Sequence, residues 1–202
     1  MAHMRRKRFP VTGFATLTTT LMAVTAFGAP GSPRTTATSV DSVTTFSALD
    51  GSASDQDGAS NGVLSLLSLD LHDGGTILID VPIAEFDVAE NLTLRGHSAI
   101  RVPYDTPPEF GPHLTIRCGG QVSIRSTAKL YANGASAGGR LIVCGEKGID
   151  VRGDARVSAD GVGPDARDDG DANDRVTPFE TSGGDVWMQS PGSVRIRESA
   201  RI

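Results

Sequence analysis

The sequence has few of the residues that stabilise a small domain through cross-links or a thick core. Its 202 residues include two cysteines and one tryptophan, and aromatic residues make up only 5% of the chain. Two cysteines, without histidines at ligand spacing, make a zinc site unexpected. The low aromatic content, beside 38% hydrophobic residues, favours a thin core of Val, Ile and Leu over a thick globular one.

Basic residues are missing from one long stretch. Residues 41–90 hold ten acidic side chains and no lysine or arginine, whereas residues 92–158 hold nine basic and five acidic side chains. The formal net charge of −5 therefore combines an acidic segment with a locally basic one. After Ala29 the sequence also lacks any run apolar enough to span a bilayer.

Residues 1–29 have the pattern of an export signal peptide, and residues 1–3 resemble a tag remnant. A cationic cluster at 5–8 precedes an apolar, threonine-rich run at 11–26 and small residues that suit cleavage. If the segment stays uncleaved it is a membrane anchor, the one membrane association that we expect. Export implies an extracellular, periplasmic or cell-surface location, where cysteines meet oxidising conditions.

Two segments between the signal and the repeats are predicted to lack regular strands. Residues 30–45 are rich in Ser, Thr and Pro, which is typical of a disordered linker. Residues 46–62 carry Asp50, Asp55 and Asp57 together with glycines. We expect them to form an acidic cap over the first strands, whose edges would otherwise be open to aggregation.

From residue 63 onward the sequence repeats with a period of eight. The pattern is clearest in segments 114–134, 141–161 and 186–202, which align without a gap and carry apolar residues at equivalent positions. Each repeat has an apolar-x-apolar triplet, such as 149–151, followed by small or polar residues. This pattern predicts a short strand with one buried face, and then a turn.

Three repeats of eight make one coil of about two dozen residues, and such coils must stack because none can bury its own apolar face. The sequence therefore predicts an all-β, right-handed parallel β-helix over residues 63–202, with loops at 103–112 and 162–182. The last repeat stops at Ile202 within an incomplete coil. We expect either that the chain is a fragment of a longer protein or that a second subunit covers the open edge.

Over residues 62–202 this pattern resembles the pectin-lyase-like superfamily of right-handed parallel β-helices. The resemblance is architectural and carries no family-specific signature. Members of that superfamily include polysaccharide-cleaving enzymes and long surface adhesins. The resemblance therefore implies extracellular work on glycans or surfaces, without choosing between the two.

Basic residues recur at two positions of the repeat, and stacking at about 4.8 Å would align them in two outward columns. The first column would hold Arg95, Arg125, Arg152 and Arg197, and the second Arg101, Lys129, Arg156 and Arg201. One interpretation is a stripe that binds an acidic polysaccharide or another polyanion. The other is that these side chains pair with Asp150, Asp154 and Glu198 and contribute only solubility.

Three further features suggest binding or cross-linking. Trp187 occupies an outward position and can either stack on a sugar ring or pack under the neighbouring loop. Cys118 and Cys144 fall one position apart on neighbouring coils, so they form either a disulfide between coils or two free thiols. One loop is rich in carboxylates, which are the ligands that calcium prefers, although their spacing is not that of an EF-hand. The loop either binds calcium or is a solvated segment without a metal. Its candidate ligands are Asp165, Asp168, Asp169, Asp171 and Asp174.

Catalytic patterns are weak. The string at 134–138 matches G-x-S-x-G, but a strand is predicted on both sides, so Ser136 is better explained as a solenoid corner than as a nucleophile. The outward positions do not gather the paired carboxylates of polysaccharide-cleaving enzymes. His72, His97 and His113 are scattered and belong to no recognisable triad.

These observations favour an exported, non-catalytic β-helical scaffold, adhesin-like, whose partner is a polysaccharide or cell-surface polyanion rather than a nucleic acid. One alternative is a polysaccharide lyase or glycoside hydrolase of the same fold, with calcium in the acidic loop. The other is a structural protein that polymerises end to end through its open edge.

Overall fold

The computed structural model describes residues 37–50, 62–161 and 182–202. They belong to one compact unit, which spans Pro33–Ile202. This part of the chain is almost entirely β-structure and includes a single short helix, α1 (Phe46–Asp50). Short strands follow from the alternation of apolar and polar residues, because each triplet presents one face to an interior.

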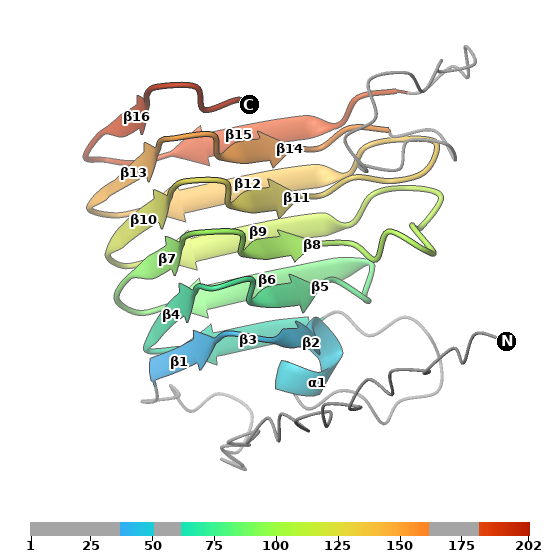
Figure 1. Ribbon diagram of the computed structural model, residues 1–202, viewed down its shortest axis with the longest axis horizontal. Helices are drawn as coiled ribbons and strands as arrows, with labels where there is room; N and C mark the ends of the chain where they lie inside the picture. The colour runs from blue at the N-terminus through green and yellow to red at the C-terminus, as the bar shows by residue number, and fades with distance from the viewer. Residues whose placement is uncertain (1–36, 51–61, 162–181) are drawn as a thin grey trace, which may run out of the picture. The chain divides into compact units, whose positions relative to one another are not determined.

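The strands form three parallel sheets in which spatial order follows chain order (Figure 1). Sheet A contains β1 (Ala37–Val40), β4 (Ser68–Leu71), β7 (Leu92–Leu94), β10 (Gln121–Ile124), β13 (Gly148–Val151) and β16 (Val194–Ile196). Sheet B contains β2 (Val43–Thr45), β5 (Thr76–Leu78), β8 (Ala99–Arg101), β11 (Lys129–Tyr131) and β14 (Arg156–Ser158). Sheet C contains β3 (Gly62–Leu66), β6 (Ile83–Val88), β9 (His113–Cys118), β12 (Arg140–Gly145) and β15 (Asp185–Gln189).

The chain passes from sheet C to sheet A to sheet B and then begins again in sheet C, and we call one such passage a coil. Register confirms the stacking: Val122 lies opposite Ile149, and Ile149 lies opposite Val194, although these residues are 27 and 45 positions apart. The three parallel sheets, with about eight residues from one strand to the next, are consistent with a parallel β-helix.

The interior is built from columns of apolar side chains that stack coil on coil. These side chains are almost entirely buried, because alternation directs every second residue of a strand inward. Sheet C contributes Leu64, Phe86, Ile116 and Val143, and sheet A contributes Leu69, Leu92, Val122 and Ile149. Branched aliphatic residues fill this interior, as the low aromatic content predicts.

The lower end of the stack, where β1 and α1 lie, differs from the sequence prediction. Residues 37–45 were expected in a disordered linker, but they form β1 and β2, which pair with β4 and β5. The linker prediction is therefore wrong for these residues. The threonines that dilute their hydrophobicity are β-branched and suit a strand once a partner strand is present.

The cap predicted at 46–62 begins with α1, and residues 51–61 lie outside the described part. Phe46 is fully buried and meets Phe86 edge to face, with ring centroids 5.0 Å apart. The aromatic pair closes the lower end of the interior. At the upper end, by contrast, inward-directed positions of the last coil are exposed, as Val194 (41%) and Ile196 (51%) show.

The two predicted loops fall between coils. In the segment 103–112 no named strand lies between β8 and β9, and Phe110 forms an isolated bridge with Ala137. Residues 162–181 of the second loop lie outside the described residues.

Candidate functional site

The first basic column exists, and a repeated turn creates it. After each sheet A strand from β7 to β16, an arginine N–H donates to a carbonyl of the coil below, at 2.9–3.0 Å. The next residue has a positive φ in every coil: Gly96, Ser126, Gly153 and Glu198. Because this turn is the same in each coil, the arginines align along one corner of the stack. We call Arg95, Arg125, Arg152 and Arg197 the corner column.

Carboxylates partly neutralise the corner column. Arg95 Nη2 lies 2.9 Å from Asp70 Oδ2. Asp150 serves two arginines, with Oδ1 2.6 Å from Arg197 Nη2 and Oδ2 3.7 Å from Arg152 Nε. Four guanidinium groups therefore share two carboxylates in ion pairs, and the pairing of the corner column is incomplete among the described residues.

Asp150 is the most enclosed of these charges. Its side chain is 7% exposed although it stands on the outer face of sheet A, because the flanking arginines cover it. It lies in register with Ser123 below and Arg195 above. A carboxylate so enclosed needs its cationic partners to compensate for lost hydration.

Arg125 differs from the other corner arginines. Its Nε donates to the Ser123 hydroxyl, and it has no ion pair with a carboxylate in the described part of the chain. No carboxylate among those residues therefore lies within ion-pair distance of its guanidinium group.

The second column has one member fewer than predicted. Lys129 lies opposite Arg156, and Arg156 bridges to Arg201, so these three stack on sheet B. Arg101 lies opposite Leu78 instead, and Ala99 is the residue in register with Lys129. The prediction for Arg101 is wrong, since it follows Arg95 by six residues whereas the other pairs are separated by four. We call Lys129, Arg156 and Arg201 the sheet B column.

The two upper residues of the sheet B column are exposed to solvent. Arg156 and Arg201 are both exposed, and neither forms an ion pair with a carboxylate within residues 37–50, 62–161 and 182–202. Lys129 Nζ lies 5.8 Å from the centre of the Tyr131 ring. Arg101 instead lies over the Tyr104 ring, 3.6 Å from its centre, and donates to the Val102 carbonyl.

Sequence reasoning missed Arg195, which adds a further cation beside the corner column. It stands in register above Asp150, and with Lys147, Asp150 and Arg197 it lines a small polar pocket. The signal was present, because Arg195 is the middle residue of the triplet Val194-Arg195-Ile196 and alternation directs such a residue outward.

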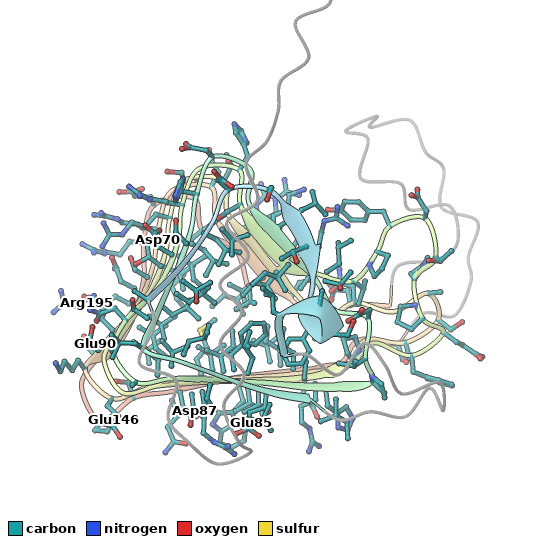
Figure 2. The ribbon with its side chains drawn as sticks, turned by 90° about the horizontal axis from the view of Figure 1, so that it is seen from below. Asp70, Glu85, Asp87, Glu90, Glu146 and Arg195 are labelled. Atoms are coloured by element: carbon teal, nitrogen blue, oxygen red, sulfur yellow. The ribbon has the colours of Figure 1, made fainter. Side chains whose placement is uncertain are left out.

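Trp187 lies on a different face from both columns. It stands on β15 of sheet C, opposite Ile142, and is 64% exposed. Figure 2 shows this separation of faces: Glu85 and Asp87 mark the outer side of sheet C, whereas Asp70 and Arg195 mark that of sheet A. Two ion pairs lie on sheet C, Arg117 with Glu85 and Arg140 with Asp185.

The two cysteines are free thiols, which is one of the two alternatives that the sequence left open. Their offset by one position is confirmed, since Cys118 lies opposite Gly145 and Cys144 opposite Arg117. Alternation sends Cys118 inward and Cys144 outward. Burial raises the pKa of the Cys118 thiol, although hydrogen bonds from the Gly120 and Leu92 backbone act in the opposite direction.

The proposed calcium ligands Asp165 to Asp174 lie outside the described residues. Within the described residues, no group of three or more His, Cys, Asp or Glu side chains could hold a metal ion. The same part of the chain contains no helix long and apolar enough to cross a membrane.

No protein-family model, curated protein or solved structure matches the chain.

Proposed function

We propose that the chain is an exported, right-handed parallel β-helix of the pectin-lyase-like kind that serves as a surface or secreted scaffold and binds an acidic glycan or another polyanion. The observation that supports this proposal most directly is the alignment of cations at one corner and on sheet B. A polymer with regularly spaced carboxylates or sulfates can lie along the stack and contact several coils at once.

The balance of charges decides which residues matter most in this proposal. Arg95 already has Asp70 as a partner, whereas Arg125, Arg156 and Arg201 have no carboxylate partner among the described residues. Arg152 lies between Arg125 and Arg197 in the corner column. The three upper coils therefore form the stronger part of the polyanion surface.

Retention on a sulfated or carboxylated matrix tests the proposal. The triple variant Arg125→Ser, Arg152→Ser, Arg156→Ser should bind the matrix about ten-fold more weakly at low salt, since each exposed ion pair contributes up to about 1 kcal/mol. The difference should shrink as added salt screens the charges.

The matched control removes cations from the opposite face. The double variant Arg117→Ser, Arg140→Ser loses side chains that already pair with Glu85 and Asp185 on sheet C. It should elute close to the unmodified protein. Losses in proportion to the number of cations removed, three against two, would mean that retention follows net charge alone, and the proposed surface would be abandoned.

The two alternative functions, a polysaccharide-cleaving enzyme and an end-to-end polymer, predict different observations. A polysaccharide lyase or hydrolase would release reducing ends or unsaturated products from acidic polysaccharides. Growth by joining the upper end of one copy to the lower end of the next must contend with Phe46 and α1, which already fill the lower end of the interior. The scaffold proposal is therefore the one that the described residues support best.

A further inference from the structure

Three side chains at the lower end of sheet A form a chain of hydrogen bonds that the sequence does not suggest. Ser39 lies on β1, and its Oγ is 2.9 Å from His72 Nε2. His72 follows β4, and its Nδ1 is 2.9 Å from Asp73 Oδ2. The three groups therefore follow in the order hydroxyl, imidazole and carboxylate, and each ring nitrogen makes one hydrogen bond.

The stacking of coils creates this contact across 33 residues. Ser39 lies in register with Asp70, and the His72 N–H donates to the Val40 carbonyl at 3.2 Å, which holds the imidazole beside β1. Asp73 has a φ of 51°, the turn conformation of the corner, and this turn brings its carboxylate back toward the His72 ring. The same corner that aligns arginines in higher coils therefore holds a histidine here.

The connectivity is that of an activated hydroxyl. In the tautomer that carries its proton on Nδ1, His72 donates to Asp73 and can accept the Ser39 proton at Nε2. Asp73 would then act as a positioning residue, because it orients the ring and stabilises the imidazolium without contacting a substrate.

A second observation at the same place is a carboxylate oxygen whose hydrogen bonding is incomplete. Asp70 Oδ2 pairs with Arg95, but Asp70 Oδ1 is buried and has no hydrogen-bond partner among the described residues. Buried oxygens are nearly always hydrogen-bonded in folded proteins, so a water or a ligand group is expected here. The Arg95 guanidinium, one coil above His72, pairs with the other oxygen of the same carboxylate.

We propose that Ser39 is a nucleophile activated by His72, and that the site accepts esters with a short acyl group. Ser39 Oγ bonds to the carbonyl carbon while its proton passes to His72 Nε2. The bond from that carbon to the leaving oxygen then breaks, and the leaving group takes the proton from His72. Water, activated by the same imidazole, releases the acid and restores Ser39.

The open surroundings determine the substrate class. Ser39 is exposed and the Asp73 side chain is 87% exposed, so an ester can approach without an opening step. A long acyl chain would need an apolar channel, which these residues do not provide. The proposal departs from the sequence expectation of a non-catalytic scaffold and does not depend on polyanion binding.

Two reactions test the proposal on the full chain. A fluorophosphonate should phosphonylate Ser39, with release of fluoride, and p-nitrophenyl acetate should yield an acetyl group on the peptide that contains Ser39. His72→Gln should slow both reactions about 100-fold, the lower range for general-base assistance. Ser39→Ala should abolish labelling of that peptide.

The test of Asp73 as a positioning residue needs a measurement that a change in folding would not reproduce. Asp73→Asn and Asp73→Gly both tolerate a positive φ, so the turn persists while the carboxylate is lost. Both variants should lower the acylation rate about ten-fold and leave the half-saturating ester concentration unchanged. An unchanged acylation rate in both would remove Asp73 from the proposal and overturn the three-residue site.

The control is His97→Gln, which removes an imidazole that contacts the Thr127 hydroxyl at 2.9 Å but has no carboxylate partner among the described residues. Its labelling should match that of the unmodified protein. The proposal is overturned if the label appears on another residue, or if His72→Gln reacts as fast as the unmodified chain.

Discussion

At the scale of single residues, Asp150 both stabilises the stack and limits its positive charge. Its enclosed carboxylate contacts Arg197 of the next coil and Arg152 of its own. Without that carboxylate, the two guanidinium groups would face each other at coil spacing. Repulsion between like charges would then act along the corner column.

Replacement of Asp150 by Asn should therefore have two effects. The free energy of unfolding should fall by about 1–3 kcal/mol, less than for a fully buried pair because the arginines are 38% and 48% exposed. Retention on an anionic matrix should become stronger, since two cations lose their counter-charge. Urea unfolding and salt elution of the same variant measure both effects.

Asp154→Asn is the matched control. Asp154 is exposed and accepts a hydrogen bond from Ser199. Its replacement should change stability by less than about 0.5 kcal/mol. If both variants unfold at the same urea concentration, the Asp150 ion pairs contribute no net stability.

At the scale of elements, the turn after each sheet A strand from β4 to β16 sets the geometry of the candidate site. The residue with positive φ is Asp73, Gly96, Ser126, Gly153 or Glu198, according to the coil. The backbone imposes the conformation in these five coils, whatever the side chain. The turn then places the preceding residue, a histidine or an arginine, at the corner.

Gly153→Ala should show how much the turn contributes. Gly153 has a φ of +75°, and an added Cβ would lie 2.9 Å from the Cα and N atoms of Ser126 in the coil below. We expect a loss of at least about 1–2 kcal/mol in unfolding free energy. Thermal and urea unfolding measure it.

Gly183→Ala supplies the comparison for that test. A Cβ at Gly183 would have no atom within 4 Å, and the residue has no positive φ. Its stability should stay within about 0.5 kcal/mol of the unmodified protein. A Gly153→Ala protein as stable as this control would show that the corner turn is adaptable.

At the scale of the whole molecule, the two ends of the described stack are unlike. The lower end is closed by Phe46, which is fully buried against Phe86. The upper end exposes Val194, Ile196 and Ile202 at 41–53% of their surface. Stability of the first coil should therefore depend on the aromatic pair more than on its own short strands.

Phe46→Ala should destabilise the fold by about 3–5 kcal/mol, because it leaves a cavity among side chains that cannot collapse into it. Amide protons of β1 and β2 should exchange faster with solvent. Phe110→Ala is the control, since Phe110 is 66% exposed and the substitution is chemically identical. Comparable losses in both variants would rule out a special role for the lower cap.

Much of this arrangement is readable in the residues. The triplets around Val122, Ile149 and Val194 predicted which side chains face inward and which coils are neighbours, and the register confirms them. The spacing of four residues between Arg152 and Arg156 likewise predicted both columns in the upper coils. The same spacing, applied to Arg95 and Arg101, would have excluded Arg101.

The sequence by itself determined the period, the inward and outward directions and the corner arginines, because strand alternation and a recurring turn are local properties. Only the tertiary structure decided that Ser39 meets His72, that Asp150 is enclosed between two arginines and that residues 37–45 form strands. These contacts join different coils. Which residues meet across coils depends on the length of the chain between them, and that length varies from coil to coil, from 22 residues between Leu64 and Phe86 to 45 between Ile149 and Val194.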